Sequence, residues 1–302
     1  MASAPVTVVV PSRDRRPLLE RKLRALEGER APFEVVVVAD ACGDDTEGFL
    51  AAYRPPYPLR WARGPGAHAA AARNLGAGLA AGEVLLFSDD DVIPRPGWVA
   101  AHARLHRRPG MAGLSTLVRP PHLERGVAAT GRAGWWHCSG AGLSLERSVF
   151  AAVGGYATDY GPYGGEDSDL GWRLRRAGVR FRRLPDAVAE HWDEGFERDA
   201  DAKAEALGRA QVAVVRRARA LAIAWPLGVH PVLLAAKSFG LRWLPAGWLR
   251  WERAFTRGAR RAWREVGGRG DAGGDTDGAA GEAGAAGEAG ADVVHGAHHG
   301  PR

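Results

Sequence analysis

Residues 84–91 read Val84-Leu85-Leu86-Phe87-Ser88-Asp89-Asp90-Asp91, an apolar run that ends directly in three carboxylates. Four consecutive apolar residues are typical of a strand that is buried on both faces. Carboxylates at the end of such a strand are costly unless a cation or hydrogen-bond donors satisfy them, and three in a row repel one another. The stretch therefore predicts a functional loop after a buried strand, with a solvated acidic turn as the alternative.

Asp89 and Asp91 are separated by one residue, so in an extended segment both carboxylates face the same ligand. Oxygen ligands of this kind suit Mg²⁺ or Mn²⁺, which also bind diphosphates. The side chain of Asp90 should then point away from the ion, and we expect this position to tolerate substitution.

Strands and helices alternate around this acidic stretch. The pattern predicts strands at Val6–Val10, Phe33–Ala39 and Glu83–Phe87 and helices at Pro17–Leu26 and His68–Ala81. Such alternation favours an α/β fold with a Rossmann-like parallel sheet, whose functional loops lie at the carboxyl ends of the strands. Beyond Arg95 the pattern is looser. It predicts further helices and strands at Trp98–His106, Gly113–Val118, Leu170–Arg176, Val179–Leu184, Val188–His191 and Lys203–Ala224.

A second acidic cluster, Gly164-Gly165-Glu166-Asp167-Ser168-Asp169, precedes the helical pattern that begins at Leu170. Carboxylates at a helix N-terminus are stabilised by the helix dipole, so simple first-turn capping is one interpretation. The two glycines permit close approach of the backbone to a ligand, which favours a general base at this position. The residues alone leave both interpretations open.

The composition places the chain among ordinary globular proteins, with 302 residues, 46% of them hydrophobic and 25% charged. The two cysteines, Cys42 and Cys138, are far apart, so no disulfide framework is indicated and a reducing compartment fits. The segment Met1–Val10 has no basic start and no long apolar stretch. We therefore expect no signal peptide and a cytoplasmic location.

Charge is distributed unevenly along the carboxyl-terminal third. Residues 203–266 hold 13 Lys and Arg against 3 Asp and Glu, whereas residues 267–302 hold 2 against 6. The basic segment also carries five of the 11 tryptophans, a combination that favours peripheral contact with an anionic membrane on its inner face. The alternative is that its helices pack on the catalytic domain and the arginines are solvated. A nucleic-acid partner is not expected, because no recognised binding module accompanies the charge.

Seven motifs occur in a fixed order between Val6 and Trp192. They are Val8-Val9-Val10-Pro11-Ser12-Arg13, Glu34-Val35-Val36-Val37-Val38-Ala39-Asp40, Ala71-Ala72-Arg73-Asn74-Leu75-Gly76, Asp89-Asp90-Asp91, Ser139-Gly140-Ala141-Gly142-Leu143-Ser144, Val153-Gly154-Gly155-Tyr156 and Glu166-Asp167-Ser168-Asp169-Leu170. In this order they resemble the inverting glycosyltransferases of family 2. The resemblance implies a GT-A fold, a nucleotide-diphosphate sugar donor and a divalent metal, Mn²⁺ or Mg²⁺.

The resemblance also implies roles for residues on the nucleotide side. Asp40 would contact the donor base, and Arg73 would approach the nucleotide or its phosphates. Pro11, Ser12 and Arg13 would line the same pocket, where the Arg13 guanidinium can stack in place of the aromatic side chain common in the family.

Roles at the reacting centre follow from the same resemblance. Asp89 and Asp91 would bind the metal and the donor sugar, and His191 resembles a third metal ligand, with an ordinary surface histidine as the alternative. Asp167 would be the catalytic base, with Glu166 orienting the acceptor.

The sequence thus predicts a GT-A catalytic domain at 1–200, a basic amphipathic helical extension at 201–266 and a disordered low-complexity tail at 267–302. The predicted function is metal-dependent, inverting transfer of a sugar from a nucleotide-diphosphate sugar to an acceptor hydroxyl. The acceptor class stays open between a glycan, such as one of the cell envelope, a lipid-linked molecule and a small molecule. The alternative is a non-catalytic protein on the same fold that binds nucleotide sugars or glycans. The sequence identifies neither the sugar nor the acceptor.

Overall fold

The computed structural model describes residues 6–118, 133–160, 163–192, 199–244, 249–267 and 293–294. The chain divides into two compact units. The first unit comprises Met1–Asp159, Glu166–Phe196 and Asp292–Arg302, and the second comprises Tyr160–Gly165 and Glu197–Ala291. The tail predicted at 267–302 lies outside the described residues, apart from Gly267 and the strand Val293–Val294. The predicted domain boundaries stay a prediction.

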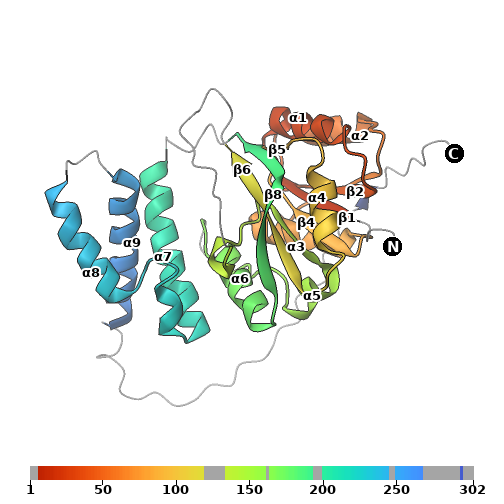
Figure 1. Cartoon of the computed structure of the whole chain (residues 1–302). Coiled ribbons are helices and arrows are strands. Elements are labelled where there is room, and N and C mark those ends of the chain that lie inside the picture. The colour runs from red at the N-terminus through yellow and green to blue at the C-terminus, as the bar shows by residue number, and fades with distance from the viewer. Residues whose placement is uncertain are drawn as a thin grey trace, which may run out of the picture. The chain divides into compact units, whose positions relative to one another are not determined.

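The first unit alternates strands and helices along its amino-terminal part (Figure 1). Its elements are β1 (Val6–Ser12), α1 (Arg16–Leu26), β2 (Phe33–Ala39), α2 (Thr46–Ala52), β3 (Leu59–Arg63), α3 (Ala69–Leu79), β4 (Val84–Phe87), β5 (Val92–Pro94), α4 (Trp98–Leu105), β6 (Met111–Val118), η2 (Trp135–His137), β7 (Leu143–Glu146), α5 (Arg147–Ala152), α6 (Glu166–Arg176), β8 (Arg180–His191) and β9 (Val293–Val294).

The strands form one sheet in the order β5-β8-β6-β7-β4-β1-β2-β3-β9. Strands β4, β1, β2 and β3 are parallel neighbours, and β6 and β8 form a second parallel pair. Strand β7 runs antiparallel between β4 and β6. The carboxyl ends of β1, β2 and β4 therefore meet at one edge, as the alternating pattern predicts, and the α/β, mostly parallel fold is confirmed.

Alternate residues of β1 point to two separate apolar cores. Val8 and Val10 pack with residues of α1, α2 and α4, whereas Val9 packs with residues of α3, α5 and α6. Strand β1 is buried along its whole length. Burial on both faces explains the continuous apolar runs of the central strands.

Several boundaries differ from those predicted. Strand β1 continues through Pro11 to Ser12 in register with β2, because the carbonyl of Ser12 still accepts a 2.8 Å hydrogen bond from the amide of Asp40. Helix α6 begins at Glu166 instead of Leu170, so the second acidic cluster forms its first turn. The two strands predicted at 179–191 are one strand, β8, with a register irregularity opposite Ser115 and Thr116.

The second unit is helical. Its elements are α7 (Ala200–Ala218), η3 (Leu221–Ala224), α8 (Pro231–Gly240), η4 (Leu241–Trp243) and α9 (Arg250–Gly267). The helix predicted at 203–224 ends at Ala218, because Arg219 adopts a left-handed conformation with φ 49°. A Cβ atom on Gly208 of α7 would overlap the carbonyl oxygen of Phe255, and one on Gly258 of α9 would overlap that of Glu205. The two glycines thus permit α7 and α9 to cross closely.

Within the described residues, no helix combines the length and apolarity that crossing a membrane requires.

Candidate active site

The acidic turn after β4 brings all three of its carboxylates against basic side chains. Nη2 of Arg73 donates a 2.6 Å hydrogen bond to Asp89, whose side chain is 29% exposed. Nη1 of Arg15 donates a 2.8 Å hydrogen bond to Oδ2 of Asp91. Asp89 is therefore the carboxylate of the turn that solvent, and hence a ligand, reaches most readily.

Asp90 does not behave as the sequence predicts. Its side chain is buried, accepts a 2.8 Å hydrogen bond from the Ser12 hydroxyl and lies 3.3 Å from Nη1 of Arg15. Burial raises the pKa of Asp90 to about 6, against the opposing effect of the Arg15 charge. These contacts argue against the expected tolerance of this position, because a replacement would leave the buried Ser12 hydroxyl without its acceptor.

A buried lysine lies beneath the turn, and sequence reasoning missed it. The side chain of Lys22, on α1, is completely buried, and its ammonium donates 2.7 Å hydrogen bonds to the Ser88 hydroxyl and to the carbonyl of Val92. Burial lowers the pKa of Lys22 to about 8, although the three aspartates oppose this. The available signal was its position three residues after Leu19 on the apolar face of the predicted helix, where a lysine is unusual.

Arg73 joins the two acidic clusters. Its side chain is buried, and Nη1 lies 3.9 Å from Oε1 of Glu166 while Nη2 binds Asp89. Burial alone would lower the pKa of Arg73, but the oxygens of Asp89, Tyr156 and Asp167 outweigh it and raise the pKa. The guanidinium is thus a positive charge in a fixed position, and two of its nitrogens, Nε and Nη1, make no hydrogen bond within the described residues.

Asp167 has the environment of a general base. It lies in the first turn of α6, is half-buried, and accepts a 2.8 Å hydrogen bond from the amide of Gly140. Burial raises its pKa from 3.8 to about 7; Arg73 opposes this, and Glu166 and Asp89 add to it. A base with a pKa near neutrality is suited to accept a proton at neutral pH.

Gly140 is a position that sequence reasoning did not assign a role. A Cβ atom on this residue would overlap Cζ of Arg73. Only glycine permits the guanidinium and the amide that binds Asp167 to share this space.

The residues predicted on the nucleotide side lie at the carboxyl ends of β1 and β2. Asp40 is buried, and its Oδ1 accepts a 2.7 Å hydrogen bond from the amide of Gly66. Pro11 and Ser12 are also buried, whereas Arg13 is exposed. Ser12 directs its hydroxyl to Asp90, so among these residues Arg13 is the one whose side chain is open to a ligand from solvent.

Two of the three predicted metal ligands lie together. Oδ1 of Asp91 is buried, has no hydrogen-bond partner within the described residues, and lies 3.5 Å from Nε2 of His191 at the end of β8. Burial opposes ionisation of Asp91, but His191, Arg15 and Lys22 outweigh it and lower the pKa of the carboxyl. No group of three His, Cys, Asp or Glu side chains among the described residues is arranged to hold a metal ion. An ion bound to a diphosphate needs only one or two protein carboxylates, so the orphaned oxygen of Asp91 fits such an ion.

The two tryptophans of η2 differ in exposure. Trp135 is buried and packs on Trp172, whereas Trp136 is 43% exposed. Acceptor specificity is expected to lie in the loops at 119–136 and 159–165, of which residues 119–132 and 161–162 lie outside the described residues.

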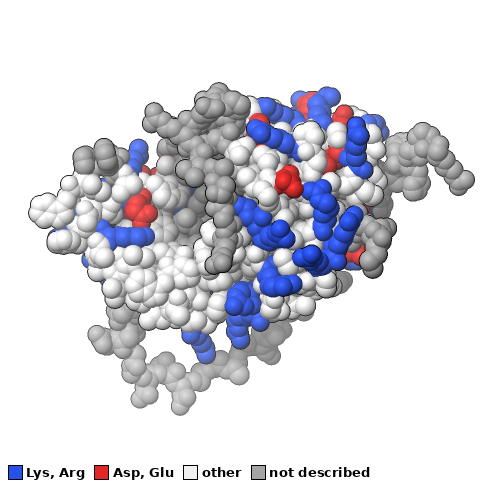
Figure 2. Space-filling view, viewed as in Figure 1, with Lys and Arg blue, Asp and Glu red and all other residues white. Residues whose placement is uncertain are grey.

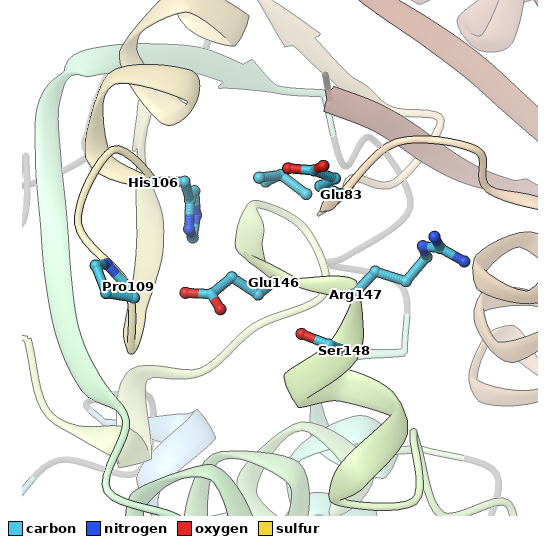
Figure 3. A pocket seen from close by; sticks show the side chains of 7 residues that line it. Glu83, His106, Pro109, Glu146, Arg147 and Ser148 are labelled. Atoms are coloured by element: carbon cyan, nitrogen blue, oxygen red, sulfur yellow. The ribbon is translucent and has the colours of Figure 1, made fainter. Parts of the chain in front are cut away.

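A pocket of about 320 Å³ lies at the other end of β4 (Figure 3). Its lining residues are Glu83, Val84, His106, Pro109, Glu146, Arg147 and Ser148. None of the predicted site residues lines it, so the candidate active site is the cluster at the carboxyl ends of the strands.

Two family models match the chain. Residues 7–133 match the family model described as glycosyl transferase family 2, and residues 122–192 match that of the N-terminal domain of galactosyltransferase. The two matches together span all the predicted site residues.

Two characterised relatives are similar in sequence. Validoxylamine A glucosyltransferase of Streptomyces hygroscopicus subsp. jinggangensis is 28% identical over 220 residues, covering 58% of this chain and 52% of the relative. Pre-mycofactocin glycosyltransferase of Mycobacterium tuberculosis is 31% identical over 210 residues, covering 62% and 42%. The chain thus spans about half the length of the curated relatives that it matches.

Solved structures share the fold. The mannosyltransferase PcManGT from Pyrobaculum calidifontis, in complex with GDP-Man and Mn²⁺, is 25% identical with a TM-score of 0.58, covering 85% of this chain and 80% of that one. S. aureus TarS 1–349, in complex with UDP-GlcNAc, is 18% identical with a TM-score of 0.58, covering 82% and 79%. With the family match, the sequence relatives and the GT-A fold in agreement, the chain belongs to glycosyltransferase family 2.

Proposed function

We propose that this chain is a metal-dependent, inverting glycosyltransferase that moves a sugar from a nucleotide-diphosphate sugar to an acceptor hydroxyl. The observation that carries the proposal is the environment of Asp167. A carboxylate held by the Gly140 amide, with a pKa raised to about 7, lies in one cluster with Glu166, Arg73 and Asp89. A binding protein has no need of a base tuned to neutral pH.

The first turn of α6 provides the residues that act on the acceptor. Asp167 takes the proton of the acceptor hydroxyl as that oxygen attacks the anomeric carbon. Glu166 orients the acceptor. Attack on the face opposite the leaving diphosphate gives inversion at the anomeric carbon.

Residues at the carboxyl ends of β1, β2 and β4 bind the nucleotide-sugar donor. Asp40, with Pro11, Ser12 and Arg13, receives the nucleotide, and Asp89 contacts the donor sugar. The open donors of Arg73 stabilise the negative charge that develops on the diphosphate.

Asp91 and His191, with Asp89, would hold a divalent metal, Mn²⁺ or Mg²⁺. Such an ion neutralises the diphosphate and makes it a better leaving group. The orphaned oxygen of Asp91 and the Mn²⁺ in the complex of the P. calidifontis mannosyltransferase support this assignment.

The test is release of nucleoside diphosphate from a panel of nucleotide sugars, with and without Mn²⁺. Asp167→Asn should abolish turnover while keeping nucleotide binding, and Asp91→Asn should abolish the Mn²⁺-dependent rise in melting temperature. Asp186→Asn is the matched control, because that carboxylate is 76% exposed and pairs with an exposed arginine outside the site. Full activity without metal, or in Asp167→Asn, would contradict the mechanism.

The same assay separates the alternative, a non-catalytic nucleotide-sugar or glycan-binding protein. A thermal shift with nucleotide sugars but no diphosphate release with any acceptor would favour binding alone.

We also propose that the protein is cytoplasmic and that the extension at 201–266 contacts an anionic membrane surface. The 13 basic residues against 3 acidic ones at 203–266, together with its tryptophans, support this contact. An acceptor that is lipid-linked, or a glycan of the cell envelope, would be reached at such a surface.

A further inference from the structure

Helix α8 and the turn η4 present an apolar face to solvent. Val232, Phe239 and Trp243 are 63%, 64% and 78% exposed. Their spacing of seven and four residues places them along one side of a continuous helical segment, and the intervening Ala235 and Ala236 are exposed as well. In Figure 2 the surface over α8 is largely free of charged residues.

The opposite side of α8 carries its charge inward. Nζ of Lys237 lies 2.6 Å from Oε1 of Glu252 on α9. Leu234, about one helical turn before Lys237, is buried. A helix on a water-exposed surface has the reverse arrangement, with apolar residues inward and charges outward. Helix α8 thus buries Leu234 and turns its single charged residue, Lys237, toward α9, while Val232 and Phe239 are left in contact with water.

The basic helix α9 does not supply this surface. Its apolar residues Ala254, Phe255 and Ala259 are buried, in line with the close crossing of α7 and α9. Helix α9 therefore packs on α7 within its own unit. The exposed apolar side chains lie instead in α8 and in the segments before and after it, at Leu221, Trp225, Leu244 and Leu249.

The segment that carries this apolar face is basic, although Glu252 on α9 pairs with Lys237. Residues 206–251 contain seven Lys and Arg and no Asp or Glu. Among the basic side chains Arg216, Arg219 and Arg242 are exposed. An apolar face with an exposed tryptophan, carried by a segment rich in arginine, complements the interface of an anionic bilayer.

We propose that the α8–η4 face, defined by Val232, Phe239 and Trp243, docks on an anionic lipid bilayer by inserting these side chains into its interface. The proposal rests on the membrane contact proposed above and assigns it to α8 instead of the basic helices. A second copy of the chain is a poorer partner, because a symmetric contact would bring the same unneutralised arginines together.

The experiment uses the full chain and sedimentation with two kinds of vesicle, phosphatidylcholine alone and equal parts phosphatidylcholine and phosphatidylglycerol. The wild type should bind the anionic vesicles, bind them less at high salt, and bind the zwitterionic vesicles weakly. Phe239→Ser with Trp243→Ser should lower the partition coefficient at least about tenfold, since both aromatic side chains lose their burial in the bilayer. Arg242→Gln should lower it about fivefold on anionic vesicles only.

Two matched controls lie in the other unit. Trp136→Ser changes a tryptophan that is 43% exposed, and Arg24→Gln changes an arginine on α1 whose side chain is 61% exposed. Both should leave vesicle binding unchanged. Circular dichroism of each variant confirms that it is folded.

The inference is overturned if the wild type binds neither vesicle or if the double variant binds as the wild type does. It is also overturned if light scattering shows a dimer that the double variant dissolves, because the face then serves a second copy. Diphosphate release from a soluble donor and acceptor is measured in parallel. Loss of vesicle binding with intact turnover identifies a surface effect, whereas absent turnover with intact vesicle binding contradicts the proposed function alone.

Discussion

The guanidinium of Arg73 donates a 2.6 Å hydrogen bond to Asp89, and this contact ties helix α3 to the acidic turn after β4. The same guanidinium lies 3.9 Å from Glu166, at the start of α6. One buried cation therefore holds the donor-side and acceptor-side carboxylates at a fixed separation. Its charge also sets the proton affinity of the residues around it.

Substitution of Arg73 separates its geometric role from its electrostatic one. Arg73→Lys keeps the charge but cannot reach Asp89 and Glu166 with two parallel donors, so kcat/KM should fall about ten- to hundredfold. Arg73→Gln removes the charge that lowers the pKa of Asp167, so the rise of activity with pH should move to higher pH. The measurement is a pH–rate profile of both variants. An unshifted profile in Arg73→Gln would show that the charge does not act on the base.

Gly140→Ala should lower kcat about a hundredfold or more with little loss of stability. The new methyl group overlaps the guanidinium of Arg73 and disturbs the amide that binds Asp167. The resulting shift of these two side chains is small, but they belong to the proposed catalytic groups, whose positions strongly affect the rate. The matched control is Gly78→Ala on α3, where a Cβ atom meets nothing within 4 Å. That variant should keep full activity and gain about 0.5–1 kcal/mol in free energy of unfolding. Equal activities of the two variants would show that the space at Gly140 has no catalytic importance.

Asp167→Asn should stabilise the protein as it abolishes activity. The folded state raises the pKa of Asp167 from 3.8 to about 7, so it retains a proton that the unfolded chain has released. Stability of the wild type therefore falls as pH rises between about 4 and 7, and the penalty is complete above pH 7. Asparagine cannot ionise, so the variant should melt a few degrees higher than the wild type above pH 7 and nearly equally near pH 4. Thermal unfolding of both proteins across this range checks the sign, and a variant that is less stable at high pH would refute the raised pKa.

Gly208→Leu should destabilise the second unit by at least about 2 kcal/mol. The side chain would meet the backbone of α9 at Phe255, which cannot move aside as a flexible side chain does. Gly240→Ala is the control, because a Cβ atom there meets nothing within 4 Å. Thermal unfolding of the two variants measures the difference. Equal stability would show that α7 and α9 do not cross as closely as their glycines indicate.

Much of the fold is readable from the sequence because its signals are local. Strand β2 is predicted to the residue, and β4 differs by one residue, since each is a short apolar run closed by acidic or turn residues. Strand β3 was missed because Leu59–Arg63 has only five residues, with arginines between its apolar ones.

The sequence by itself determined the α/β architecture, the family and the placement of the first acidic cluster at the carboxyl end of a strand. Apolar periodicity, turn residues and the order of motifs all lie along the chain, and a parallel sheet gathers strand ends at one edge whatever the details of packing.

Only the tertiary structure decided which charges neutralise which. The contacts of Arg15, Lys22 and Arg73 with the acidic stretch join residues that are 76, 66 and 16 positions apart, and nothing in the local sequence of these three residues predicts them. The burial of Asp90 and the outward orientation of the apolar face of α8 were likewise visible only in the tertiary structure. Burial and hydrogen-bond partners depend on contacts between segments far apart in the chain, and these exist only once the chain has folded.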